Sequence, residues 1–457
     1  KKVYQYVKIL SFDKEKKQQP STSAQKKDKV KQSLQEDDLF FKRLILIGSW
    51  NESNDEDIKF VSSITELEYK EIQKKLIKIK LDNDSLLSYK NGIWTLKDKN
   101  ELWSRIKDVL LKKEISSFIE TAERILEERD PALDLPDNQR CFAPAFKKNK
   151  KYSNNIRRGI VEGFALLANT DDFANCEAYD IRLLCQHQIR LLLDNAEWAK
   201  WASLKQLIHT IAEISPSAFL TCLNKALNNE SCNMSEVFKP YNYRNENYTT
   251  EYLTSIEMLA QIPEFYTQCC NALISINKIA KDEYTSNSLY KILSPWENTS
   301  IPSKSQFHFL QVLFSRDDDL AWEIVTTILF RRHYSVDSLP NFKWMKFNPK
   351  KNNLTSSEVK ALVQEYLKLA LENAKNKQQR LFSLLKENNN YSLSYLHKVC
   401  DKIKICLKQE KKNAENENLW ISLVDVLNGF YYPVDKLSAE NKEKYNTIKK
   451  LESLIAP

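Results

Sequence analysis

Apolar side chains recur every three or four residues from residue 101 to the end of the chain. This spacing predicts one long amphipathic helix from Ile106 to Ile125. It predicts further helices over residues 156–167, 181–192, 198–211, 218–227, 249–261, 264–280, 304–315, 318–331, 355–387, 391–410, 416–428 and 437–455. Such helices joined by short polar turns are typical of an α-solenoid, here with degenerate repeats because no fixed repeat motif stands out.

Three local signals mark where some of these helices begin. Ser153 is placed to cap the helix over 156–167, and Ser215 precedes Pro216 at the start of 218–227. Three successive carboxylates, Asp317 to Asp319, precede an apolar run, which favours a helix N-terminus over a metal site because they meet the positive end of the helix dipole.

The pattern is different between residues 41 and 97. Apolar spacing predicts two short helices, over 57–64 and 66–79, and Asn91-Gly92 then favours a tight hairpin turn between two β-prone runs. Helix, turn, helix and hairpin is the order of a winged helix, whose second helix can present lysines to DNA. The lysines available there are Lys70, Lys74, Lys75, Lys78 and Lys80. Glu66, Glu68 and Glu71 dilute their charge, which favours a rigid spacer inside a multidomain ATPase over a DNA reader.

The net charge is concentrated at the N-terminus. Residues 1–35 contribute +7 of the formal net charge of +8, so the rest of the chain is close to neutral. Residues 11–35 are polar and are expected to be a disordered linker after a possible strand over Val3–Leu10, and a flexible lysine tail is favoured over a phosphate-binding arm. Because the chain starts with Lys1 and its last predicted helix is unfinished in context, we expect both ends to be cuts from a larger protein. The expected organisation is a lysine-rich segment over 1–40, a winged-helix-like module over 41–128 and a helical-repeat region over 129–457.

Catalytic and cofactor motifs are absent from the sequence. There are only 5 glycines and no P-loop, His-Glu-x-x-His or Gly-x-Ser-x-Gly motif, so we expect no enzyme activity and no bound cofactor. The 9 cysteines include no Cys-x-x-Cys pair, which favours buried free thiols and a cytoplasmic location over disulfides. Cys176, Cys185 and His187 match no zinc spacing. No apolar run reaches 18 residues, so no membrane insertion is expected.

One segment combines cations with aromatic side chains outside a predicted helix. Arg331 and Arg332 precede a loop that carries Phe342, Trp344 and Phe347 among several lysines. Such a set can form a partner-binding surface, because binding hot spots favour tryptophan, tyrosine and arginine. The alternative is that the aromatic side chains only plug the loop onto the helices.

Several motifs together resemble one family, the bacterial antiviral STAND NTPases (the AVAST, or Avs, defence proteins). The run Leu44–Asp57 is similar to the Gly-x-Trp-Asn-Glu segment that follows the ATPase module of that family. The other similar segments are Gly92-Ile93-Trp94, Glu101-Leu102-Trp103, Asp130–Pro136, Ser153 with Arg158–Leu167, Trp201–Leu204, Ser286–Leu289, Pro295-Trp296, Ala321-Trp322, Leu419-Trp420 and Tyr432-Pro433. Departures are Ser49, where many members have arginine, and Glu297-Asn298-Thr299, which replaces a common Pro-Gln-Thr.

The resemblance implies that this chain is the sensor region of a larger ATPase. In that family a helical-repeat sensor binds a phage protein such as a terminase or portal, which drives self-association of the parent and activates an effector. ATP and magnesium would be bound by the parent only, and nucleic acid is not an expected ligand of this region. A winged-helix nucleic-acid-binding protein and an inert helical scaffold are the alternatives.

Overall fold

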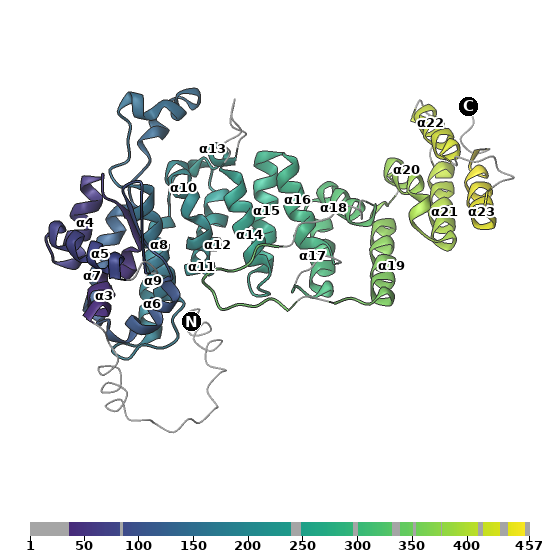
Figure 1. Ribbon diagram of the computed structural model, residues 1–457. Coiled ribbons are helices and arrows are strands. Elements are labelled where there is room, and N and C mark those ends of the chain that lie inside the picture. The colour runs from purple at the N-terminus through teal and green to yellow at the C-terminus, as the bar shows by residue number, and fades with distance from the viewer. Residues whose placement is uncertain are drawn as a thin grey trace, which may run out of the picture. The chain divides into compact units, whose positions relative to one another are not determined.

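Helices make up almost all of the regular structure in the computed structural model (Figure 1). The structure describes residues 36–82, 86–238, 248–295, 300–330, 339–350, 353–375, 377–409, 415–429 and 437–452. Within these ranges the strands form one three-stranded sheet. The prediction of a predominantly all-α chain with helical repeats is confirmed, whereas Val3–Leu10 and the expected linker lie outside the described residues.

The chain divides into two compact units. Unit 1 holds Lys1–Glu251 together with Lys343–Lys346, and unit 2 holds Tyr252–Phe342 and Phe347–Pro457. Unit 1 therefore contains both the expected module over 41–128 and the first helices of the expected repeat region after residue 129.

The first part of unit 1 contains a helix-turn-helix, formed by α4 and α5, which is preceded by a helix and a strand and followed by a hairpin. Its elements are α3 (Glu36–Ile47), β1 (Ser49–Asn51), α4 (Asp55–Thr65), α5 (Tyr69–Asp82), β2 (Leu87–Lys90) and β3 (Ile93–Leu96). The strands are antiparallel in the order β1-β3-β2, with Trp50 paired to Trp94. Asn91 and Gly92 have φ angles of 53° and 76°, as the predicted tight hairpin turn requires. Both predicted helices and the hairpin are confirmed, whereas α3 and β1 had not been predicted.

The prediction of a single long helix from Ile106 to Ile125 was wrong. The chain instead forms α6 (Lys99–Ile106), the 3₁₀ turn η1 (Lys107–Val109) and α7 (Lys112–Leu126). Leu110 and Leu111 have extended backbone angles, and the Glu114 carboxylate accepts a hydrogen bond from the Leu111 amide at 2.9 Å. A new helix N-terminus is therefore capped at a point where the apolar spacing continues without interruption.

The remaining elements of unit 1 follow α7 in the sequence. They are η2 (Pro131–Asp134), η3 (Asp137–Phe146), α8 (Asn154–Ala168), α9 (Ala178–Leu193), α10 (Trp198–Leu204), η4 (Lys205–Leu207), α11 (Ile208–Ile214), α12 (Pro216–Leu227), η5 (Glu230–Cys232) and α13 (Ser235–Phe238). Helix α8 packs against α3, β1, α9 and α11 and is buried along most of its length. The predicted caps are present, because the Ser153 and Ser215 hydroxyls accept hydrogen bonds from the amides of Ile156 and Ala218.

Unit 2 is built from helices that pack mostly on their neighbours in sequence. They are α14 (Thr249–Ala260, from Tyr252 onward), α15 (Tyr266–Ala280), α16 (Glu283–Leu293), α17 (Ser303–Arg316), α18 (Asp318–Phe330), α19 (Ser356–Asn373), α20 (Gln378–Lys386), η6 (Asn388–Asn390), α21 (Leu393–Gln409), α22 (Glu415–Asn428) and α23 (Ala439–Lys449). Contacts join α15 to α16, α17 to α18, α18 to α19 and α20 to α21, as in a helical repeat.

Two details of unit 2 differ from the predicted helices. The single helix predicted over 355–387 is interrupted, because Lys375 has a φ angle of 49° and ends the first half. Helix α16 had not been predicted. Asp318 and Asp319 lie in the first turn of α18, as predicted, but they also form ion pairs with Lys377 and Arg380.

Candidate functional site

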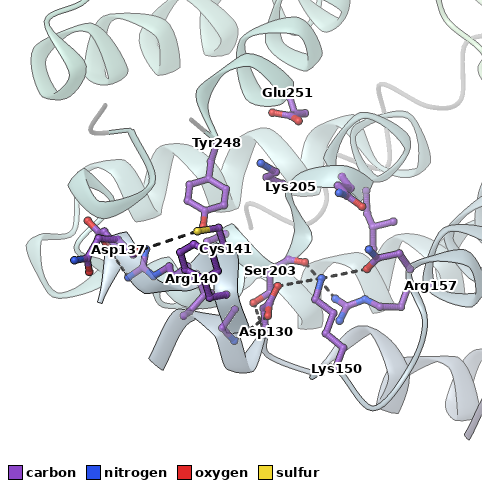
Figure 2. Close-up of a pocket in the computed structure, with 18 residues that line it drawn as sticks. Asp130, Asp137, Arg140, Cys141, Lys150, Arg157, Ser203, Lys205, Tyr248 and Glu251 are labelled. Atoms are coloured by element: carbon purple, nitrogen blue, oxygen red, sulfur yellow. Dashed lines mark hydrogen bonds and ion pairs between the residues drawn. The ribbon is translucent and has the colours of Figure 1, made fainter. Parts of the chain in front are cut away.

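A pocket of about 660 Å³ opens on unit 1 (Figure 2). Its walls come from η2, η3, the first turn of α8 and the junction of α10 with η4, and Tyr248 and Glu251 complete it. The volume is within the range of pockets that hold small molecules or the anchoring side chains of a peptide. None of the sequence motifs pointed to these elements as the wall of one pocket.

Leu133 and Ala202 give the pocket an apolar floor, and they belong to a larger buried cluster. Leu133, Ala199 and Ala202 form a buried cluster, against which Trp198 and Tyr248 pack. Phe142 also lines the pocket and is 58% exposed. The pocket therefore offers an aliphatic base and aromatic side chains, the surfaces that contribute most to binding energy in protein recognition.

The rim carries charges of both signs. Lys150 pairs with Asp130 at 3.0 Å, and the Arg140 guanidinium pairs with Asp137 at 2.9 Å. The ammonium group of Lys205 lies 4.8 Å from the centre of the Tyr248 ring, a cation–π distance. Figure 2 shows all of these residues lining the same pocket.

The buried Arg157 holds three walls of the pocket together. Its side chain is 2% exposed and donates hydrogen bonds to the carbonyl oxygens of Glu128 and Ser203, at 3.2 and 3.3 Å. Burial lowers the pKa of the Arg157 guanidinium, and the carboxylate of Glu128, 3.7 Å away, opposes that shift. Because arginine stays protonated in proteins, a charge is fixed beneath the pocket and ties α8 to the loop before η2 and to α10.

Ser203 adds a second connection beneath the pocket. Its hydroxyl accepts a hydrogen bond from the Asp130 amide at 2.8 Å and donates one to the Ala199 carbonyl at 2.6 Å. The start of η2 is thereby fixed on α10, so the pocket is formed before any ligand arrives.

The predicted partner-binding segment lies only partly within the described residues. Arg331 and Arg332 fall outside them. Phe342, Trp344 and Phe347 are all half-buried, and the rings of Phe342 and Phe347 contact each other edge to face at 5.3 Å. Trp344 belongs to unit 1, where the Lys343 ammonium lies 4.6 Å from the centre of its ring.

The backbone at Lys343–Met345 is held by a buried carboxylate. Glu213 of α11 is 1% exposed and accepts hydrogen bonds from the amides of Lys343, Trp344 and Met345, at 2.7–3.2 Å. His209 lies 3.9 Å from Glu213, and burial lowers the pKa of its imidazole. Sequence reasoning missed Glu213, although an acidic residue among the apolar residues of 208–214 signals a buried group that needs donors.

Two ion pairs fix the lysines of the same segment. The Lys343 ammonium is 3.1 Å from Glu162, which also pairs with Lys99, and the Lys346 ammonium is 2.6 Å from Asp171. These contacts are those expected if the loop plugs onto the helices.

The cysteines and histidines form no metal site in the described part of the chain. No group of three or more His, Cys, Asp or Glu side chains there is placed to hold a metal ion. All 9 cysteines are free, and 7 of them are buried as predicted, whereas Cys176 is half-buried and Cys141 is exposed at the pocket. Burial raises the pKa of the Cys185 thiol, which makes it unreactive.

None of the helices over the described ranges combines the length and the apolar character needed to span a bilayer.

Comparison with known proteins identifies no relative, because no family model, no curated protein and no solved structure matches the chain.

Proposed function

We propose that this chain is the recognition region of an antiviral STAND ATPase. A helix-turn-helix module of the winged-helix class, over α3–β3, precedes a helical-repeat sensor that binds a phage protein of the terminase or portal kind. ATP and magnesium belong to the parent protein, and ligand binding drives its self-association and the activation of an effector.

The observation that carries this proposal is that several segments resembling the family pack against one another. Gly159 and Gly163 lie on the face of α8 that meets the end of α3. A Cβ atom on Gly159 would lie 1.8 Å from the Ile47 carbonyl oxygen, and one on Gly163 would lie 2.1 Å from that of Leu46. Only glycine permits so close an approach of two backbones.

A second contact joins the Gly-x-Trp-Asn-Glu run to the start of α8. The buried Asp57 carboxylate accepts hydrogen bonds from the Ser153 amide at 3.0 Å and hydroxyl at 2.5 Å, and from the Asn51 amide at 2.9 Å. Desolvation raises the pKa of Asp57, and the hydrogen bonds from Ser153 and Asn51 counteract the shift.

A third contact joins the Asp-Pro-Ala-Leu segment to Trp201–Leu204 through the Asp130–Ser203 hydrogen bond described above. These contacts bring segments that resemble the family, although they are far apart in the sequence, together in unit 1, and this supports the proposal.

The pocket on unit 1 supports protein recognition over catalysis. An apolar floor, aromatic side chains and a rim with both charge signs suit the anchoring side chains of a protein ligand. An inert scaffold would not require a preformed concave site supported by a buried arginine.

Direct binding tests the proposal. The purified chain is titrated by calorimetry with purified large terminase subunits and portal proteins from a panel of tailed phages. We expect at least one of them to bind with micromolar or better affinity and with a weak dependence on salt, because apolar contacts dominate. Absence of binding to every panel member at 10 µM, roughly −7 kcal/mol, would overturn the proposal.

Substitution then locates the ligand. If the predicted segment contacts the partner, replacing Trp344 and Arg332 by alanine weakens binding by about 2 kcal/mol or more, roughly 30-fold. Trp420→Ala removes another half-buried tryptophan and is the matched control. A Trp344 variant with a lower melting temperature and unchanged affinity would show that the ring only anchors the loop.

A further inference from the structure

The second helix of the helix-turn-helix has an exposed outer face. At 3.6 residues per turn, five side chains of α5 fall within about 100° of arc on the side opposite its buried residues. These five are Lys70, Lys74, Ile77, Lys78 and Leu81, and all are exposed. The buried residues on the other side are Ile72, Leu76 and Ile79.

The lysines of this face form a row along the helix axis. Lys70, Lys74 and Lys78 are spaced four residues apart, which places them about 6 Å apart along the axis. Glu66 and Glu68 both precede the helix, and the charge of Glu66 is also neutralised by an ion pair with Arg43 at 2.7 Å. Glu71 is exposed and lies about 20° of arc beyond Lys78, so one carboxylate borders the face.

A hydrogen-bonded cluster fixes the orientation of α5 against the sheet. The Glu52 carboxylate accepts hydrogen bonds from Gln73 of α5 at 2.7 Å and from Tyr89 of β2 at 2.7 Å. The Trp50 indole donates a hydrogen bond to the Tyr69 hydroxyl at 3.0 Å. The lysine row is therefore presented by a rigid helix that is tied to the hairpin.

We propose that this face of α5 binds the phosphate backbone of duplex DNA. A row of three cations matches a linear polyanion, and the second helix of a helix-turn-helix is the element that enters the major groove in proteins that bind duplexes. Ile77 and Leu81 would contact the apolar edges of bases, such as thymine methyl groups. An apolar protein surface suits this face less well, because it would bury three lysines without counter-charges.

Fluorescence anisotropy with a labelled 20-base-pair duplex tests this inference between 50 and 200 mM salt. The variant carries Lys70→Gln, Lys74→Gln and Lys78→Gln, which keep good helix formers in place. The matched control removes three exposed lysines of unit 2 by Lys304→Gln, Lys360→Gln and Lys398→Gln and so has the same net charge. Circular dichroism confirms that both variants keep their helices.

We expect micromolar duplex binding by the unaltered chain. The α5 variant should bind at least tenfold more weakly at 50 mM salt, and its plot of log affinity against log salt should be shallower by about 2.7, since each phosphate contact contributes about 0.9. The control variant should stay within twofold of the unaltered chain. No duplex binding, equal losses in both variants, or displacement by polyglutamate as effective as by unlabelled duplex would overturn the inference. The last outcome would indicate an acidic protein as the ligand.

Discussion

Adding one methyl group at Gly163 tests the packing of α8 against α3. In an ordinary helix interior, replacing glycine by alanine stabilises the protein by about 1 kcal/mol, because alanine loses less backbone freedom on folding. Here the new Cβ atom would lie 2.1 Å from the carbonyl oxygen of Leu46, and the atoms nearest to it all belong to the backbone. No side-chain rotation can relieve that contact.

The steric cost exceeds the gain in propensity. A carbon and an oxygen in contact are about 3.3 Å apart, so α3 and α8 must separate locally by about 1 Å. Such overpacking of a well-packed interior costs about 1–3 kcal/mol, and a rigid carbonyl places this site near the upper value. Subtracting the propensity term leaves a net destabilisation of about 2 kcal/mol for Gly163→Ala.

Hydrogen exchange measured by mass spectrometry at increasing urea concentration follows this change in the full chain. Peptides from α3 and α8 report the free energy of unfolding of unit 1. Peptides from unit 2 are an internal reference, and their exchange rates should not change. Gly429→Ala is the matched control, because its new Cβ would have its nearest neighbour at 3.2 Å, and we expect its effect to be below about 1 kcal/mol. If Gly163→Ala stabilised α8 by about 1 kcal/mol, as propensity alone predicts, the close approach of the two helices would be refuted.

Three further predictions concern other parts of the chain. Glu213→Gln replaces a carboxylate by a weaker acceptor, so the amide of Trp344 should exchange at least tenfold faster, and unchanged exchange would contradict the role assigned to Glu213. Hydrogen bonding to Lys377 lowers the pKa of Asp318 to about 2, so this carboxylate stabilises unit 2 above its ordinary pKa near 3.8 and loses that effect as pH falls toward 2. Because the side chain is 25% exposed, we expect a loss of about 1 kcal/mol after solvent screening, which Asp318→Asn should abolish in acid titrations followed by circular dichroism. A maleimide should label the exposed Cys141 first, and peptide mapping that finds a buried cysteine labelled first would contradict the structure.

Local signals in the sequence predicted local structure well. Apolar spacing located most helices, and Ser153 and Ser215 marked two helix starts, because caps and periodicity act within a few residues. The same spacing failed at 107–111, where the capping interaction of Glu114 overrides a pattern that is apolar on both sides of the break. It also failed at Lys375, whose left-handed backbone ends a helix without a glycine to announce it.

The pocket could not be predicted, because its parts are brought together only by tertiary contacts. Asp130 and Ser203 are 73 residues apart, and nothing near either residue indicates their hydrogen bond. Arg157 has the same property, because arginines in an amphipathic helix usually lie at the surface, and nothing in the sequence distinguishes the buried Arg157 from the exposed Arg158 beside it.

Glu213 shows how a sequence can still mark a tertiary contact without identifying it. An ionised carboxylate inside an apolar helix face is costly unless several donors meet it, so its presence at that position requires a partner from elsewhere in the chain. The structure supplies three successive amides at residues 343–345, next to the tryptophan that sequence reasoning chose as a contact for the ligand. Holding this backbone rigid lowers the entropy that a half-buried Trp344 would lose on binding, so an anchored loop and a binding surface are compatible. The two roles separate only when affinity and stability are measured on the same variant.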